Sequence, residues 1–313
     1  MGAAIEVDGL SKYFGDFLAV DHVSFDVKQG EIFGFLGPNG AGKTTTMRML
    51  TNLARPSDGH ARIMGLDTVR DSIAVRTVIG IVPEASNTFS ELSTVNNLIF
   101  TGALYGMRSK NRAKRAAELI ELFGLDEHRA KRADKLSMGL RRRLTIAMSL
   151  MHDPRVVFFD EPTSGLDVES ARLIRSVVLD LHKQGVTVFI TTHNMEEANA
   201  LCERIAVIDH GHMIAVNTPE RLKQAATQSQ AIEISFAEKL SPGEEGELGQ
   251  LPGVHEMRAL GDKYQMLTSD PPAVLRALFA MVCEKGLRPV SVSTLGPSLE
   301  EVFVQLTAGR EAS

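Results

Sequence analysis

Three short segments of the chain are almost continuously apolar and lack the polar alternation of a half-exposed strand. They are Ile32–Leu36, Val156–Phe159 and Val186–Ile190. Continuous apolar runs of this length are typical of strands in a parallel sheet whose two faces are both covered. Glycine-rich or polar sequence follows each run, and ligands of open α/β sheets gather outside the carboxyl ends of the strands. The pattern therefore predicts an α/β fold with a ligand site at one edge of its sheet.

The segments around these runs predict two further parts of the fold. The β-rich segments Ala4–Val7 and Val23–Val27, with an extended segment at Ala61–Met64, indicate an antiparallel β subdomain. Between residues 94 and 150, leucines and other apolar residues recur at helical spacing among many charges, which predicts an inserted helical subdomain. Residues 204–216 predict a hairpin with a Gly-containing turn.

Composition changes near Arg221–Gln230, where Gln, Ala, Thr and Ser accumulate. We expect a first domain at 1–222, with its helical subdomain at about 85–152, and a second domain at 230–313. The second domain is predicted to be a small C-terminal α+β module, with a Gly- and Glu-rich loop at Ser241–Glu247. Its expected elements are strands at 231–236, 254–259, 264–268 and 289–293 and helices at 273–285 and 298–306.

Bulk composition limits the class of protein. The chain has 313 residues, 43% hydrophobic and 23% charged, as in ordinary globular proteins. Its net charge of −5 argues against nucleic acid as the main partner. Two cysteines cannot form a disulfide framework, which fits a reducing cytosol. The first ten residues lack the apolar segment of a signal peptide, and we expect no membrane-spanning segment.

The first apolar run leads directly into GPNGAGKTT, which fits the phosphate-loop pattern G-x-x-x-x-G-K-[ST]. A helix is predicted at Thr45–Leu53, so the motif has a strand before it and a helix after it. Glycines let backbone N–H groups surround phosphate oxygens at a helix N-terminus. We expect Lys43 to reach the β- and γ-phosphates and Thr44 to bind Mg²⁺. The predicted nucleotide-binding residues are Gly37, Pro38, Asn39, Gly40, Ala41, Gly42, Lys43, Thr44 and Thr45.

Two acidic residues and a histidine end the other two apolar runs. Asp160 and Glu161 follow one run, and His193 follows the other. A carboxylate at a strand end beside a phosphate loop is the expected second Mg²⁺ partner, and we assign this role to Asp160. Glu161 lies one residue nearer the γ-phosphate and is expected to orient or deprotonate the attacking water. His193 is expected to hydrogen-bond the γ-phosphate.

The segments LSMGLRRRL, at 136–144, and SGLD, at 164–167, complete a set of six motifs with those above. In this order and spacing, about residues 4–220 closely resemble the nucleotide-binding subunit of an ABC transporter. The resemblance implies a P-loop NTPase core with an antiparallel β subdomain and an inserted helical subdomain. It also implies ATP and Mg²⁺ as ligands, and a head-to-tail dimer with two ATP molecules at its interface.

The same resemblance assigns further residues. Ser137 and Gly139 would contact the γ-phosphate of ATP held by the opposite subunit, and Asp167 would line the interface. The backbone N–H groups and serine hydroxyl at a helix N-terminus suit an anion. Phe14 stands where an aromatic side chain of the family stacks on adenine.

Three residues depart from the family's usual pattern. Met138 and Leu140 replace a glycine and the glutamine of LSGGQ, and the loss of a glycine restricts the backbone. Glu84 stands where a glutamine senses Mg²⁺ and the attacking water, and a carboxylate there can still ligate Mg²⁺. The VPE form at Glu84 and the C-terminal SLEEVF, at 298–303, are similar to the branch that serves exporters of drugs, sodium or lipids.

The resemblance implies a transport motor in which ATP hydrolysis powers export through a separate integral membrane permease. The chain would then lie in the cytoplasm, on the inner face of the cell membrane, as a homodimer or heterodimer. Residues 84–98 are the expected contact with the permease. The alternative is a soluble ABC ATPase acting on nucleic acid or the ribosome, which the single cassette and two cysteines disfavour. A third possibility is a degenerate partner that binds ATP without hydrolysing it.

Overall fold

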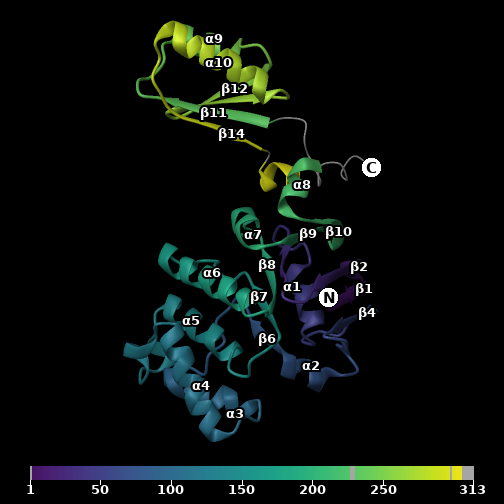
Figure 1. Cartoon of the computed structure of the whole chain (residues 1–313). Helices are drawn as coiled ribbons and strands as arrows, with labels where there is room; N and C mark the ends of the chain where they lie inside the picture. Colours follow the sequence, from purple (N-terminus) through teal and green to yellow (C-terminus); the bar gives the residue numbers. More distant parts are fainter. Residues whose placement is uncertain (1, 226–229, 297, 305–313) are drawn as a thin grey trace. The chain divides into compact units, whose positions relative to one another are not determined.

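The computed structural model describes residues 2–225, 230–296 and 298–304. The chain divides into two compact units, Met1–Pro219 and Glu220–Ser313 (Figure 1). Among the described residues, no helix is both long and apolar enough to cross a membrane.

A six-stranded sheet forms the centre of the first unit. Its strand order is β10-β9-β3-β8-β7-β6, and every neighbouring pair is parallel except the hairpin β9–β10. All residues of β3, β7 and β8 are buried, as the continuous apolar runs predicted. The hairpin expected at 204–216 is also confirmed. The strands are β3 (Ile32–Leu36), β6 (Ile79–Val82), β7 (Val156–Asp160), β8 (Thr187–Thr192), β9 (Arg204–Asp209) and β10 (His212–Asn217).

A second, antiparallel sheet of order β2-β1-β4-β5 packs on the first. Phe25 of this sheet stacks on Phe33 of the parallel sheet, with ring centroids 5.4 Å apart. Phe189 belongs to the same cluster, and its ring centroid lies 6.1 Å from that of Phe25. The two sheets therefore share one aromatic core. The strands are β1 (Ala3–Phe14), β2 (Phe17–Lys28), β4 (Asp58–Ile63) and β5 (Leu66–Asp67).

Two groups of helices complete the first unit. One group packs on the sheets, and the other is the helical insert, in which α3 contacts α4 and α5, and α5 also contacts β6 (Figure 1). The helical character predicted between residues 94 and 150 is confirmed. The first group is α1 (Lys43–Leu50), α2 (Ser72–Val78), α6 (Val168–Lys183) and α7 (Met195–Leu201); the second is α3 (Thr94–Leu104), α4 (Ser109–Leu122), η1 (Asp126–His128), η2 (Ala133–Lys135) and α5 (Met138–Ser149).

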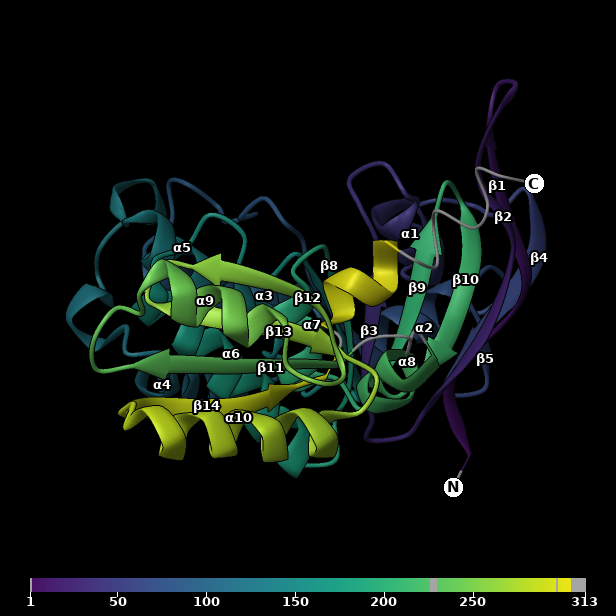
Figure 2. The ribbon, with the colours of Figure 1, turned by 90° about the horizontal axis from the view of Figure 1, so that it is seen from above.

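The second unit is a four-stranded antiparallel sheet of order β12-β13-β11-β14. Helices α9 and α10 cover one face of this sheet (Figures 1 and 2), and Ile232, Ile234, Met266 and Leu278 are buried between the layers. The α+β character and all four predicted strands are confirmed. The elements are α8 (Pro219–Ala225), β11 (Gln230–Phe236), α9 (Pro242–Gly249), β12 (Val254–Leu260), β13 (Lys263–Thr268), α10 (Pro271–Lys285) and β14 (Pro289–Leu295).

The loop predicted at Ser241–Glu247 is wrong, because this segment begins helix α9. Ser241 caps the helix by accepting a hydrogen bond from the N–H of Glu244, whose side chain accepts from the N–H of Ser241. A proline in the first turn and burial of Leu248 further stabilise the helix over its glycines. Of the last predicted helix, at 298–306, residues 299–304 are helical and 305–306 lie outside the described residues.

Gly34, in the middle of β3, is explained by the close approach of Cys202, which follows α7. A Cβ atom on Gly34 would lie 2.7 Å from Sγ of Cys202 and 3.4 Å from Cγ1 of Ile205. The glycine therefore allows the chain after α7 to pack directly on the strand that leads into the phosphate loop.

We predict that Gly34→Ala lowers the free energy of unfolding by about 1–3 kcal/mol, because the added methyl group overpacks this contact. The double variant Gly34→Ala/Cys202→Ala should recover part of the loss, since it removes the sulfur atom. Urea unfolding followed by circular dichroism measures both. Equal stability of Gly34→Ala and the native chain would show that the contact is not tight.

Candidate functional site

The phosphate loop connects β3 to α1 at the carboxyl edge of the parallel sheet. Two of its glycines are required by close backbone contacts: a Cβ on Gly37 would lie 2.3 Å from the carbonyl oxygen of Ile208, and one on Gly42 would lie 2.8 Å from that of Ala19. Gly42, which precedes α1, also has a φ of 102°. Helix α1 begins at Lys43, so its first N–H groups face the loop.

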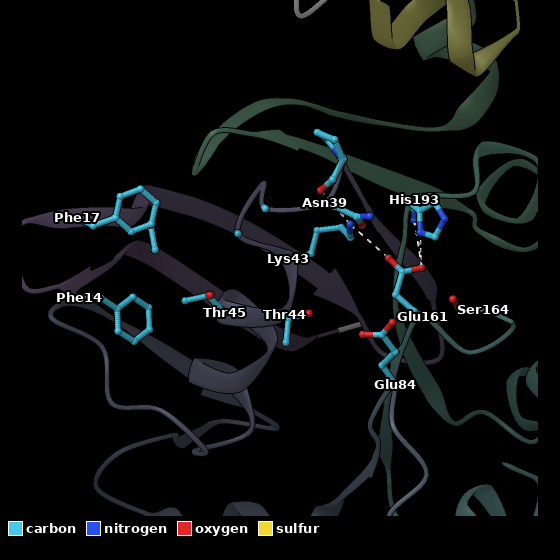
Figure 3. A pocket seen from close by; sticks show the side chains of 14 residues that line it. Phe14, Phe17, Asn39, Lys43, Thr44, Thr45, Glu84, Glu161, Ser164 and His193 are labelled. Atoms are coloured by element: carbon cyan, nitrogen blue, oxygen red, sulfur yellow. Dashed lines mark hydrogen bonds and ion pairs between the residues drawn. The ribbon is translucent and has the colours of Figure 1, made fainter. Parts of the chain in front are cut away.

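A pocket of about 520 Å³ opens over this loop (Figure 3), a volume within the usual range for small-molecule sites. Figure 3 shows two phenylalanines at one end, the loop in the middle, and two glutamates with His193 at the other end. Predicted residues that line the pocket are Phe14, Pro38, Asn39, Gly40, Gly42, Lys43, Thr44, Thr45, Glu84, Glu161 and His193.

The ammonium group of Lys43 is almost fully buried at the centre of this site. It donates to the carbonyl oxygens of Gly37, at 2.7 Å, and Pro38, at 3.1 Å, and lies 3.2 Å from Oε1 of Glu161. The other carboxylate oxygen of Glu161 lies 2.9 Å from Nδ1 of His193 and accepts from its backbone N–H at 3.3 Å. Three residues from three different segments thus form one hydrogen-bonded chain.

Glu161 adopts a left-handed backbone conformation, with a φ of 46°, immediately after β7 ends. This conformation is uncommon for residues other than glycine. It turns the chain at the sheet edge, and the carboxylate lies against Lys43. Figure 3 shows the same carboxylate above that of Glu84, which comes from the segment after β6.

Asp160 lies behind the pocket lining and is 4% exposed. Its carboxylate accepts from the hydroxyl of Thr44 at 3.1 and 3.2 Å, and from the hydroxyl of Thr191. Carboxylate and hydroxyl oxygens are the ligands that Mg²⁺ prefers. No cluster of three His, Cys, Asp or Glu side chains able to hold a metal occurs within the described ranges. A Mg²⁺ ion bound by Thr44 and Asp160 would therefore need phosphate and water oxygens as well.

The aromatic end of the pocket comes from the turn between β1 and β2, which projects from its sheet in Figure 2. Phe14 and Phe17 face each other across this turn and are 55% and 66% exposed. Nζ of Lys12 lies 5.2 Å from the ring centroid of Phe14. Phe17 also lines the pocket and is not among the residues predicted from the sequence, although its position three residues after Phe14, across a glycine turn, is a signal for such a pair. Ala19 and Ser164 are two further lining residues that were not predicted.

Besides Asp160, five of the predicted site residues do not line the pocket. Gly37 and Ala41 are buried within the phosphate loop. Ser137 caps α5, accepting from the N–H of Leu140 at 3.3 Å, and Asp167 caps α6. The N–H of Ser170 lowers the pKa of Asp167. A Cβ on Gly139 would lie 2.6 Å from Oγ of Ser170, so the two helix N-termini pack directly against each other.

This fold and this site together define a phosphate-loop protein that binds a nucleoside triphosphate. Solved structures share the fold. An ABC transporter subunit of Clostridium perfringens, cbiO1, matches 71% of this chain and 91% of its own, with 25% identity and a TM-score of 0.65. A dimeric ATP-binding cassette in a post-hydrolysis state, bound to ADP and Pi, matches 68% of this chain and 98% of its own, with 25% identity and a TM-score of 0.63.

The family model described as "ABC transporter" matches residues 20–164. The Nod factor export ATP-binding protein I of Rhizobium sp. (strain N33) is 37% identical over 98% of both chains. The doxorubicin resistance ATP-binding protein DrrA of Mycobacterium tuberculosis is 37% identical over 97% of this chain and 93% of its own. The chain therefore belongs to the ABC transporter family of ATP-binding proteins, in the branch that includes these proteins.

A further relative is longer than this chain. The Escherichia coli (strain K12) protein named "Probable multidrug ABC transporter ATP-binding protein YbhF" is 41% identical over 72% of this chain. The matched region spans 39% of that protein's own length.

We predict that Lys43→Met lowers the free energy of unfolding by about 3 kcal/mol, because it leaves the carboxylate of Glu161 buried without its cation. The double variant Lys43→Met/Glu161→Gln should be less destabilised than Lys43→Met alone. Urea unfolding of the full chain without nucleotide measures both. Additive losses in the double variant would contradict the pairing of these two side chains.

Proposed function

We propose that this chain is the ATP-hydrolysing subunit of an ABC exporter and powers transport through a separate membrane permease. The observation that carries the proposal is the chain of contacts from Lys43 through Glu161 to His193, beside the contact between Thr44 and Asp160. These contacts support the proposal, because they join a cation, a carboxylate and an imidazole along one pocket edge, with a carboxylate–hydroxyl pair behind it. Such groups are what phosphoryl transfer to water needs.

Each residue along this edge has a proposed role. Lys43 and the N–H groups of the phosphate loop hold the β- and γ-phosphates. Thr44 and Asp160 supply oxygen ligands to Mg²⁺, which would neutralise charge on the phosphates. Glu161 orients or deprotonates the attacking water, because its carboxylate lies in the same pocket as the loop. His193 hydrogen-bonds the γ-phosphate and keeps Glu161 in place.

Glu84 is proposed to act beside Glu161. It lines the same pocket and follows β6, next to the strand that ends in Asp160. A carboxylate there adds negative charge near the γ-phosphate, but it supplies a further oxygen that can ligate Mg²⁺ or water. Turnover is thus compatible with a glutamate at this position.

A head-to-tail dimer would complete the site. Ser137, Gly139 and Asp167 lie away from the pocket of their own chain, at the N-termini of α5 and α6. In the proposed dimer, Ser137 and Gly139 contact the γ-phosphate held by the opposite subunit, and Asp167 lines the interface. The dimeric ATP-binding cassette among the solved structures supports this arrangement. Both a homodimer and a heterodimer fit it.

The permease is proposed to contact residues 84–98 and the neighbouring face of α3. Phe89 and Phe100 meet edge to face there, with ring centroids 4.8 Å apart, and are 41% and 42% exposed. Leu104, one turn beyond Phe100, is 64% exposed. An exposed apolar stripe of this kind suits the side of a helix from a partner protein. The chain would then lie on the inner face of the cell membrane.

The alternative function, action on nucleic acid or the ribosome, has no specific observation in its favour. The net charge of −5 opposes phosphate-backbone binding, and the relatives named above are named for export and drug resistance. The permease would determine which substrate is transported.

We predict that Phe14→Ala raises the KM for ATP by about 5- to 100-fold, because stacking on a base is worth about 1–3 kcal/mol. The value of kcat should change little, since the ring contributes to binding in both ground and transition states. Phe17→Ala should show a smaller increase. Tyr13→Ala is the matched control, an exposed neighbouring aromatic outside the pocket lining. An unchanged KM in Phe14→Ala would contradict the assignment.

The proposed function is tested with the permease itself. Affinity purification of the tagged chain from detergent-solubilised native membranes should recover a stoichiometric polytopic membrane protein. In lipid vesicles the pair should couple ATP hydrolysis to transport. Glu161→Gln should lower both rates by about 100-fold or more while ATP binding remains. Recovery only with ribosomes or nucleic acid, or native hydrolysis by Glu161→Gln, would contradict the proposal.

A further inference from the structure

Arg142 is the middle one of three consecutive arginines in α5, and it is 3% exposed. Its neighbours make different contacts. Arg141 donates to the carbonyl oxygens of Asp134 and Leu136, within the helical insert. Arg143 lies 4.0 Å from Glu169, a residue whose side chain is almost fully exposed. Arg142 instead extends from the insert to the carboxyl ends of β6 and β7.

The guanidinium group of Arg142 donates to five backbone carbonyl oxygens in two separate segments. Nη1 donates to Pro83 and to Glu84, the second at 2.9 Å. Nη2 and Nε donate to the successive carbonyls of residues 160–162, at 3.1, 3.3 and 3.1 Å. Since a guanidinium has five N–H donors, these carbonyls account for the whole donor set. One side chain thus ties the segment after β6 to the segment that ends β7.

The two segments carry the carboxylates of the proposed active site. Glu84 and Glu161 both line the pocket, and Asp160 contacts Thr44. The backbone of Glu161 is held at a positive φ, a conformation that persists only where surrounding contacts enforce it. The hydrogen bonds from Arg142 to residues 160–162 lie directly on this turn.

Charge also favours an arginine at this position. Burial lowers the pKa of Arg142, and the negative charges of Asp160, Glu84 and Glu197 oppose that shift. The guanidinium stays charged in proteins, so it offsets part of the negative charge that the carboxylates gather here. A lysine ammonium has three donors on one atom and cannot span five carbonyls.

We propose that Arg142 is a positioning residue for ATP hydrolysis, which fixes the separation of the Glu84 and Glu161 carboxylates through their backbone. Because Arg142 lies five residues after Ser137 on the same helix, this separation also depends on the position of α5. The N-terminus of α5, proposed to contact ATP on the opposite subunit, is thereby connected to the hydrolytic carboxylates. The inference rests on the proposed function, since it assigns Arg142 to the hydrolysis step.

Arg142→Lys tests the proposal in the full chain, since it keeps the charge and removes the planar set of donors. We expect kcat for ATP hydrolysis to fall by about 10- to 100-fold, as misplacement of catalytic groups by about 1 Å can cost a hundredfold. The dissociation constant for ATP should stay within about threefold, because Arg142 does not line the pocket. Rates are measured at a temperature below the midpoint of thermal unfolding of each variant. Each rate is then divided by the fraction of the protein that binds ATP.

Arg115→Lys is the matched control. Arg115 belongs to the same helical insert and donates to the backbone carbonyl of Leu150, where α5 ends, but it contacts neither 83–84 nor 160–162. Its kcat should equal that of the native chain within about twofold. A comparable loss of kcat in Arg115→Lys would show that loosening the insert anywhere is enough, and would overturn the proposal.

A double variant separates positioning from general damage. On a Glu161→Gln background, Arg142→Lys should change the remaining rate by less than about threefold, because the group that it positions is already disabled. Equal fold losses on both backgrounds would overturn the proposal, as would a native kcat in Arg142→Lys. If Glu161→Gln itself hydrolyses ATP at the native rate, the proposed function fails instead, whatever Arg142→Lys does.

Discussion

The phosphate-binding end of the first unit depends on a buried positive charge, the ammonium group of Lys43. An isolated charge of this kind is costly to bury, so its neighbours must satisfy it. Two carbonyl oxygens of the phosphate loop and the carboxylate of Glu161 do so. Because β8 lies between β3 and β7 in the sheet, this contact crosses a whole strand. It therefore ties the loop to the turn after β7, and so it sets the distance between the groups proposed to bind phosphate and the carboxylate proposed to activate water.

The aromatic core fixes how far the aromatic end of the pocket lies from the phosphate loop. Stacking of Phe25 on Phe33 and its contact with Phe189 join the antiparallel sheet to the parallel one. The same antiparallel sheet carries the β1–β2 turn, so Phe14 is held at a set distance from the phosphate loop. On the proposed function, a nucleotide would span these two points, with its base at one end and its phosphates at the other. The packing of the two sheets thus sets the distance between the aromatic end of the pocket and the phosphate loop.

Much of this arrangement could be predicted from the sequence, because its signals are local. Continuous apolar runs indicated the buried strands, and the glycine pattern before Lys43 indicated the loop that follows the first of them. Contacts between distant segments were harder to predict. Phe17 enters the pocket through a hairpin pairing, and the cap of α9 outweighs glycines that suggested a loop. Arg142 stands between two other arginines, and only its burial and its contacts in the structure distinguish it from them.

The β1–β2 turn has a consequence for which nucleotides the chain can use. On the proposed function, the β1–β2 hairpin would face the base with Phe14, Phe17 and Ala19, which present rings and a methyl group rather than side-chain hydrogen-bonding groups. Stacking on an aromatic ring discriminates poorly among bases, because every base has a π-face. Selectivity between bases generally requires polar groups that a wrong base leaves unpaired. The nucleoside triphosphate that the protein hydrolyses would then be determined by the relative abundance of purine and pyrimidine triphosphates in the cell rather than by recognition of the base.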